Sequence, residues 1–313
     1  MCTAVNLFGT HHLFGRTFDY EKSFGQQVVS SPRRFSFGEF ESAYSIIGVA
    51  TVVNGMPLYF DGMNERGLCG AALNFPMWST YYHSVSGKIN IPSYHLLSYI
   101  LGSCTGVGEA RERLKEVNVT PDSISEDMPA TPLHWIFADG KNALVVESVR
   151  EGVKIYDNPM GILANSPPFD YHSAHLAGYM SLHSGQPENR ISRADLPVYS
   201  RGMAAMGLPG DFSSTSRFVR AAFLKKNALV REGDSAVTKY FHIMESLSIP
   251  YGVVRAEDGS AVSTIYTCLA DTAEKIFYFT TYSCRRIQAV RHNPEIKKLC
   301  RYSMDGGEDI RFL

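Results

Sequence analysis

Segments typical of β-strands occur in consecutive groups along this chain, and helical segments lie between the groups instead of alternating with single strands. β-Branched and aromatic runs separated by Gly, Pro and Asn are typical of strands joined by short turns. Strands are predicted at residues 2–8, 12–18, 27–30, 44–53, 57–60, 67–73, 133–137, 143–149, 152–156, 262–269, 275–280 and 286–290. This grouping favours an α+β fold with antiparallel sheets over a doubly wound parallel sheet.

Apolar residues recur at helical spacing between the strand groups. Helices are predicted at residues 93–101, 107–117, 172–180, 216–227 and 235–247. No G-x-G-x-x-G or Walker pattern follows a strand, so the sequence does not support nucleotide binding. No repeat or linker divides the chain, which predicts one domain.

The composition argues against several classes of protein. Thirty basic and 31 acidic residues leave a net charge of −1, and no basic cluster exceeds a pair, so nucleic acid is not an expected partner. Polar residues interrupt the N-terminus, unlike a secretory signal. No apolar stretch approaches the roughly 20 residues of a membrane span. We therefore expect a cytoplasmic protein without a membrane span.

The cysteines and histidines do not form a metal-binding pattern. Six cysteines are scattered without a C-x-x-C pair, and His172 and His175 are the one close histidine pair among ten. In a reducing compartment the cysteines are expected to be free and mostly buried. We predict no metal and no other cofactor.

Cys2 directly follows the initiator methionine. If Met1 is removed, Cys2 carries a thiol and a free α-amine on one carbon atom. The amine has a reference pKa of about 7.7–8.0, and an adjacent base of this kind can activate a thiol nucleophile. Position alone also fits an ordinary second residue behind a retained methionine.

The first two predicted strands give Cys2 a neighbour. If residues 9–11 form the loop between them, Cys2 lies opposite Phe18, and Arg16 shares its face of the sheet. The Arg16 cation would then favour the thiolate, although a one-residue shift of register would remove the contact. Asp19 falls on the opposite face and would reach the amine only if the chain bends. A surface ion pair of Arg16 and Asp19 is the alternative.

Asn74 and Asn165 each stand where an apolar strand meets a proline turn. Amide groups in such places can donate to a developing oxyanion, but asparagine also commonly supports turns. Arg217 begins a predicted helix and could equally be a solvated side chain.

Seven sequence blocks together resemble the choloylglycine hydrolases, the group of bacterial bile salt hydrolases and penicillin V acylases. The blocks run in order from residue 2 to about residue 290. They are MCT (1–3), FGRTFD (14–19), DGMNERGL (61–68), LNFP (73–76), TPLHW (131–135), NSP (165–167) and LPGDF with SRF (208–212, 216–218). The resemblance implies an N-terminal nucleophile hydrolase, a four-layer αββα sandwich over residues 2–313, in a homotetramer.

The resemblance also implies roles for individual residues. Cys2 would be the nucleophile and its own α-amine the base, once Met1 is removed. Asp19 would orient that amine, and the two asparagines would contact the oxyanion and the substrate amide. The other catalytic positions are Arg16, Asp19, Asn74, Asn165 and Arg217.

A steroid substrate requires an apolar pocket with a few polar groups. By the resemblance, this pocket would include the aromatic segment 75–82 and the side chains of Arg16, Phe18, Asn74, Ile124, Met128 and Leu133. Ordinary packing is the alternative for each apolar member. Arg201 lies in a Ser-Arg sequence similar to a selectivity loop linked to taurine conjugates, and a guanidinium suits a sulfonate.

The implied activity is cleavage of the C24 amide of glycine- and taurine-conjugated bile salts through a Cys2 thioester, with taurine conjugates favoured. Re-conjugation with amino acids would be a side activity. A penicillin V acylase or another N-acyl amide hydrolase is the alternative, although Asn74 resembles the bile salt branch. A non-catalytic bile-acid-binding protein is the alternative from another class. A chain that keeps Met1 is expected to bind bile salts and cleave almost none.

Overall fold

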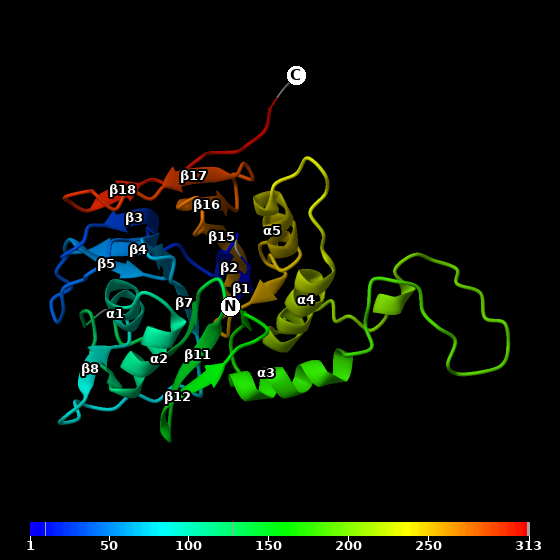
Figure 1. Ribbon diagram of the computed structural model, residues 1–313, viewed down its shortest axis with the longest axis horizontal. Helices are drawn as coiled ribbons and strands as arrows, with labels where there is room; N and C mark the ends of the chain where they lie inside the picture. Colours follow the sequence, from blue (N-terminus) through cyan, green and yellow to red (C-terminus); the bar gives the residue numbers. More distant parts are fainter. Residues whose placement is uncertain (10, 127, 312–313) are drawn as a thin grey trace.

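Two antiparallel sheets lie face to face in the computed structural model, and helices cover the outer face of each (Figure 1). The structure describes residues 1–9, 11–126 and 128–311. The layer order is helix, sheet, sheet, helix, so the predicted αββα sandwich is confirmed.

The first sheet contains the N-terminal hairpin. Its strands lie in the order β13 (Ile162–Leu163), β1 (Cys2–Leu7), β2 (Leu13–Tyr20), β15 (Ala261–Asp271), β16 (Ile276–Thr281) and β17 (Gln288–Arg291), with β14 (Val254–Arg255) beside β15. Helix α4 (Ser214–Asn227) contacts β1, and α5 (Ala236–Glu245) contacts β2 and β15. The Ser213 side chain begins α4 by accepting a hydrogen bond from the Ser216 N–H, a group that the helix itself leaves without a partner.

The second sheet lies against α1 (Leu96–Ser103) and α2 (Val107–Lys115). Its strands follow the order β12 (Gly152–Asp157), β11 (Ala143–Val149), β10 (Leu133–Ala138), β7 (Cys69–Asn74), β6 (Asp61–Asn64), β4 (Ile46–Val53), β3 (Gln27–Ser31) and β18 (Cys300–Tyr302), with β5 (Met56–Tyr59) paired to β4. A separate parallel pair, β8 (Ile89–Pro92) with β9 (Val117–Thr120), was not predicted. At four residues each, these strands are too short to show a clear alternation.

The central strands of the second sheet are buried on both faces. Val28 and Val49 belong to the core between the sheets, whereas Val29 and Ala50 pack in the core beneath α1 and α2. Successive side chains of a strand point to opposite faces. Such strands are therefore apolar almost continuously along the sequence.

The predicted register of the first hairpin is confirmed. Cys2 pairs with Phe18, and Ala4 pairs with Arg16. Residue 10 of the predicted loop lies outside the described residues. A Cβ atom on Gly15 would overlap the main-chain carbonyl of Cys268 in β15, so glycine is needed for this close pairing.

Some predicted boundaries were wrong. The helix predicted at 172–180 begins earlier, as α3 (Phe169–Leu176), and continues into the 3-10 turn η1 (Ala177–Tyr179). Pro168 is the N-cap of α3. Proline has no N–H, but an N–H at this position makes no hydrogen bond within the helix, so the helix loses none. The helix predicted at 93–101 begins at Leu96, after a turn over residues 93–95.

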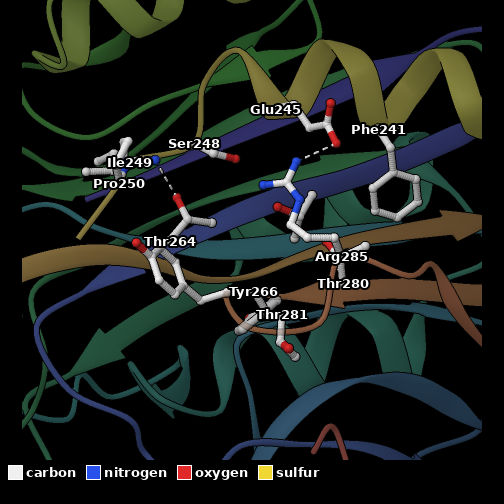
Figure 2. A pocket seen from close by; sticks show the side chains of 12 residues that line it. Phe241, Glu245, Ser248, Ile249, Pro250, Thr264, Tyr266, Thr280, Thr281 and Arg285 are labelled. Atoms are coloured by element: carbon white, nitrogen blue, oxygen red, sulfur yellow. Dashed lines mark hydrogen bonds and ion pairs between the residues drawn. The ribbon is translucent and has the colours of Figure 1, made fainter. Parts of the chain in front are cut away.

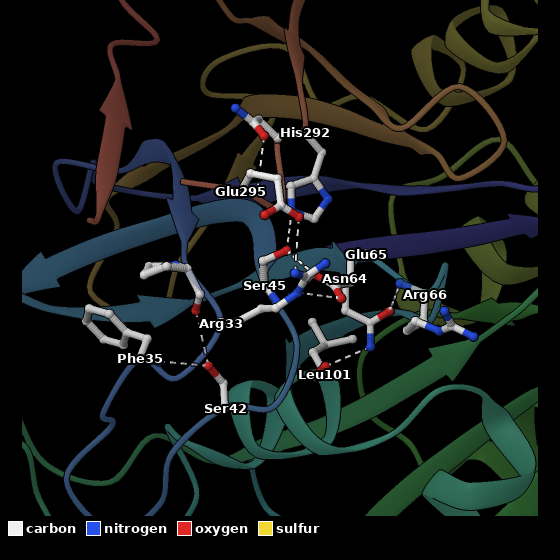
Figure 3. Close-up of polar contacts among 12 residues, drawn as sticks. Arg33, Phe35, Ser42, Ser45, Asn64, Glu65, Arg66, Leu101, His292 and Glu295 are labelled. Atoms are coloured by element: carbon white, nitrogen blue, oxygen red, sulfur yellow. Dashed lines mark hydrogen bonds and ion pairs between the residues drawn. The ribbon is translucent and has the colours of Figure 1, made fainter. Parts of the chain in front are cut away.

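A polar network joins the C-terminal segment to the second sheet (Figure 3). The Arg33 Nε donates to both carboxylate oxygens of Glu65 at 2.8–2.9 Å, and the Ser45 hydroxyl lies 3.0 Å from His292 Nε2. The neighbouring Asn64 amide donates to the carbonyls of residues 101 and 104 at 2.7 Å each, which satisfies the C-terminus of α1.

Residues 181–212, which include η2 (Met203–Ala205), extend away from the two sheets as a long segment at the right of Figure 1. Large apolar side chains on this segment are exposed, among them Ile191, Leu196, Tyr199 and Met206. Within the described part of the chain, none of the helices combines the length and the hydrophobicity that crossing a membrane requires.

Candidate active site

Cys2 lies at the wall of an apolar pocket lined by both sheets. It begins β1 and is 3% exposed. Arg16 and Phe18, on the same face of the hairpin, line the pocket with it, and Asn74 lies at the end of β7 in the second sheet. The cavity has a volume of about 150 Å³. A buried thiol therefore faces an apolar cavity that holds one arginine and one amide.

The other pocket residues predicted from the sequence also line this cavity: Phe18, Ile124, Met128 and Leu133. The aromatic segment 75–82, which lies within the described residues, does not line it. Phe75 instead stacks on His134, with ring centroids 4.4 Å apart. Phe24, Phe60 and Trp135 also line the cavity, and none of them was predicted from the sequence. Strand alternation places Phe24 and Phe60 on no particular face, because both lie at or beyond strand ends.

Arg16 is held in place by main-chain carbonyls. Its Nη1 donates to the oxygens of Phe60 at 3.2 Å and Ala72 at 2.5 Å, and its guanidinium carbon lies 5.0 Å from the centre of the Phe18 ring. Burial opposes its charge, but the Cys2 thiol and Asp61 raise the pKa of Arg16 above its ordinary value. Arg16 therefore stays a cation beside Cys2.

Asn165 and Arg217 hold the main chain at Cys2 from the outer side of the sheet. The Asn165 Oδ1 accepts a hydrogen bond from the Cys2 nitrogen at 2.6 Å and another from Arg217 Nη2 at 2.9 Å. Arg217 Nη1 donates to the Cys2 carbonyl at 2.5 Å and to the hydroxyl of Thr3. Burial lowers the pKa of Arg217, and the negative charges of Asp19 and Cys2 oppose that shift.

The two asparagines are joined directly. The Asn165 Nδ2 donates to the main-chain oxygen of Asn74 at 2.8 Å. An amide nitrogen carries two hydrogens, so one N–H of Asn165 remains for another acceptor. Both residues stand at separate strand-to-turn positions in the sequence, and the fold brings them together next to Cys2.

Asp19 is buried on the opposite face of β2 from Arg16. Its carboxylate accepts hydrogen bonds from Thr17 at 3.0 Å and from Thr264 at 2.6 Å. Burial raises the pKa of Asp19, against the opposing effects of Arg217 and the amino terminus of the chain. The Met1 amine donates to the main-chain oxygen of Asp19 at 2.5 Å. While Met1 is attached, the Cys2 nitrogen is a peptide nitrogen and has no lone pair available for a proton.

Residues of β15 complete the surroundings of the site, and sequence reasoning missed them. Thr264 and Tyr266 line a second cavity of about 370 Å³ beneath α5 (Figure 2). Thr264 connects that cavity to Asp19, and the Tyr266 hydroxyl donates to buried Asp61 at 2.6 Å. Because β15 lies about 245 residues after β2, local sequence patterns carry no signal for this pairing.

Arg201 is not brought to the pocket. It lies, exposed, in the extended segment of residues 181–212 and does not line the cavity that contains Cys2. A substrate contact by Arg201 therefore stays a prediction.

His172 and His175, the close histidine pair of the sequence, both lie on α3. His172 is buried and His175 packs between Tyr171 and Tyr179. Among the described residues, no cluster of three or more His, Cys, Asp or Glu side chains could hold a metal ion.

Comparison with known proteins agrees over nearly the full chain. Residues 2–300 match the model of linear amide C–N hydrolases of the choloylglycine hydrolase family. A bile salt hydrolase/transferase of Lactiplantibacillus plantarum is 41% identical over 302 residues, 94% of this chain and 93% of the relative. A bile salt hydrolase/transferase of Clostridium perfringens is 36% identical over 98% of this chain and 95% of its own.

Solved structures agree with the same assignment. A variant of the conjugated bile acid hydrolase of Clostridium perfringens superposes with a TM-score of 0.92 at 33% identity, covering 99% of both chains. A penicillin V acylase of Agrobacterium tumefaciens, 21% identical with a TM-score of 0.73 over 93% of this chain and 86% of its own, shares the fold. The chain therefore belongs to the choloylglycine hydrolase family of linear amide C–N hydrolases.

Proposed function

We propose that this enzyme hydrolyses the C24 amide of glycine- and taurine-conjugated bile salts. The observation that carries the proposal is the position of Cys2, which faces an apolar pocket on one side and is held by Asn165 and Arg217 on the other. The similar proteins named above, which act on bile salts, agree with a steroid in that pocket.

Removal of Met1 would create the base. The free Cys2 amine would take the place of the peptide nitrogen that now lies 2.6 Å from Asn165 Oδ1. At working pH a fraction of this amine is neutral, because its reference pKa is about 7.7–8.0. It would take the thiol proton, and the Arg16 cation would favour the resulting thiolate.

The thiolate then attacks the amide carbon, and negative charge develops on the carbonyl oxygen. The free N–H of Asn165 and the amide of Asn74 are the groups proposed to stabilise it. The Cys2 ammonium gives its proton to the leaving nitrogen of glycine or taurine, which breaks the C–N bond and leaves a thioester. Water loses a proton to the same amine, attacks the thioester and releases the bile acid, and the proton returns to sulfur.

An amino-acid amine could attack the thioester in place of water, which would re-conjugate the bile acid. We propose this as a side activity, and two relatives are named hydrolase/transferase. The present cavity of about 150 Å³ is smaller than the roughly 300–1,000 Å³ typical of small-molecule sites. The walls of the pocket would therefore move apart when a steroid binds.

Arg201 does not line the pocket of its own chain, and we propose that it contacts the taurine end of the substrate from a second subunit. Exposed apolar side chains on the same segment support an oligomer, and we propose the homotetramer that the family resemblance implies. The kcat/KM ratio for taurocholate and glycocholate should fall in Arg201→Ala. An unchanged ratio would refute a role for Arg201.

The decisive assay measures free taurine and glycine released from conjugated bile salts, with penicillin V tested in parallel. Mass spectrometry first identifies protein that has lost Met1. That protein should release the amino acid, and Cys2→Ala should release none. Hydrolysis of penicillin V alone would favour the acylase. Binding of bile salts without release, in protein lacking Met1, would favour the non-catalytic alternative.

A further inference from the structure

Two buried histidines and one glutamate lie behind the asparagine pair. His134 on β10 is paired across the sheet with Glu147 on β11, and neither side chain is exposed. The His134 Nδ1 lies 3.3 Å from Glu147 Oε1. The same oxygen accepts a hydrogen bond from the Phe169 N–H at 2.9 Å, at the first residue of α3. Glu147 thus connects His134 to the helix that carries the second histidine.

His134 contacts the neighbours of both asparagines. Its Nε2 lies 2.7 Å from the main-chain oxygen of Ala164, the residue before Asn165. Since a carbonyl only accepts, this nitrogen carries the proton and donates it. The imidazole also stacks on Phe75, the residue after Asn74, with planes 7° apart. One side chain therefore fixes the two segments that supply the amides.

His172 contacts the Asn165 segment from the helical side. Its Nε2 donates to the main-chain oxygen of Asn165 at 2.8 Å, and the Ser214 hydroxyl donates to the same oxygen at 2.9 Å. Its ring stacks on Phe218, next to Arg217, with centroids 5.0 Å apart. Burial lowers the pKa of His172 to about 4, so it is a neutral donor at physiological pH.

We propose that His134 and His172, anchored by Glu147, are positioning residues that fix the main chain on both sides of the Asn165 amide. The proposal rests on the proposed role of Asn165 and Asn74 at the oxyanion. The carbonyls of residues 164 and 165 each accept from one histidine, so neither peptide can rotate without losing a buried hydrogen bond. A displacement of about 1 Å at a reacting group can lower the rate about 100-fold.

The test compares His134→Phe with His134→Gln. Phenylalanine keeps the stack on Phe75 and removes the donor to Ala164, whereas glutamine keeps an N–H donor at a similar reach. We expect kcat for the conjugate to fall about 10- to 100-fold in His134→Phe with KM changed less than about threefold, because the pocket wall is intact. His134→Gln should recover most of kcat.

His12→Phe is the matched control. His12 is also buried, lies 2.6 Å from Asn6 Oδ1 and 3.1 Å from the Thr272 hydroxyl, and does not contact the asparagine segments. The melting temperature of His12→Phe should fall as that of His134→Phe does, but its kcat should stay unchanged. Equal loss of kcat in both variants, or an unchanged kcat in His134→Phe, would overturn the proposal.

A readout without substrate separates this proposal from the choice of substrate. Asn165 also contacts the Cys2 nitrogen, so the pH midpoint of Cys2 alkylation by iodoacetamide should shift in His134→Phe and not in His12→Phe. If wild-type protein lacking Met1 hydrolyses no conjugate while this shift is present, the substrate is wrong and the positioning role stands. If the wild type hydrolyses conjugates and neither kcat nor the midpoint changes in His134→Phe, the positioning role is wrong.

Discussion

Replacing Asn165 by alanine removes the side chain on which most contacts of the site converge. Asn165 accepts hydrogen bonds from the Cys2 nitrogen and Arg217, and it donates to the main-chain oxygen of Asn74. The side chain is 93% buried, as its 7% exposure shows, so water does not replace these partners freely. The variant therefore perturbs both the nucleophile and the proposed oxyanion contact.

The expected loss has two parts that can be measured separately. Removal of one oxyanion donor lowers kcat about 100- to 1,000-fold, equivalent to about 3–4 kcal/mol. Three buried partners, the Cys2 nitrogen, Arg217 Nη2 and the Asn74 carbonyl, each lose a hydrogen bond, which costs about 1–3 kcal/mol apiece in stability. KM for the bile salt should change little, because Asn165 does not line the apolar cavity.

Asn64→Ala is the matched control for stability. Asn64 is 1% exposed, and its amide makes short hydrogen bonds to the end of α1, as Figure 3 shows. The assay measures taurine release over a range of taurocholate concentrations, with urea unfolding on the same samples. Asn64→Ala should lower the free energy of unfolding by about as much as Asn165→Ala does, and it should leave kcat unchanged.

Two results would refute the reasoning. If Asn165→Ala keeps kcat within about threefold, less than 1 kcal/mol of transition-state stabilisation came from this amide. If Asn64→Ala loses kcat as strongly, the effect follows from general destabilisation. An increase in KM alone would show that Asn165 contributes to binding of the substrate in the ground state and not to stabilising the oxyanion.

Three further predictions concern charge. Burial lowers the pKa of three histidines from 6.5 to about 4, namely His12, His172 and His292. Below pH 6.5 the unfolded chain therefore binds more protons than the folded chain. The free energy of unfolding, measured in urea, should fall by about 1.4 kcal/mol per histidine for each pH unit down to about pH 4. A free energy of unfolding that does not change with pH would contradict this. Thr264→Val removes a hydrogen bond that lowers the pKa of Asp19, so the acid limb of the pH–rate profile should shift to higher pH. Arg16→Lys keeps the charge but not the guanidinium that donates to two carbonyls. The value of kcat/KM should therefore fall about 10- to 100-fold, and the free energy of unfolding by about 1–3 kcal/mol. Unchanged kinetics would show that the charge alone suffices.

Local patterns predicted the strand groups well. The register of the first hairpin followed from a short loop, because antiparallel pairing between adjacent strands depends only on loop length. Short strands such as β8 and β9 were not predicted, because four residues do not define a period of side-chain alternation. The predicted start of α3 is three residues late, because paired prolines are typical of a turn and Pro168 is instead the N-cap.

The site was predictable only in parts. Cys2, Arg16 and Phe18 share one hairpin, so strand alternation placed them on one face before any tertiary structure was known. Separate sequence positions predicted roles for Asn74, Asn165 and Arg217, and only the family resemblance implied that they belong to one site. Their hydrogen bonds to one another and to Cys2 connect residues 52 to 215 positions apart in sequence.

By itself the sequence determined the nucleophile, its arginine neighbour and the class of fold, because each depends on local spacing or on the resemblance. Tertiary structure alone decided that Asp19 accepts a hydrogen bond from Thr264, and that His134 and His172 support Asn165 from two sides. It also separated Arg201 from the pocket of its own chain. These features depend on pairing between strands and helices far apart in sequence, and burial of both faces of a sheet leaves no local pattern that reports such pairing.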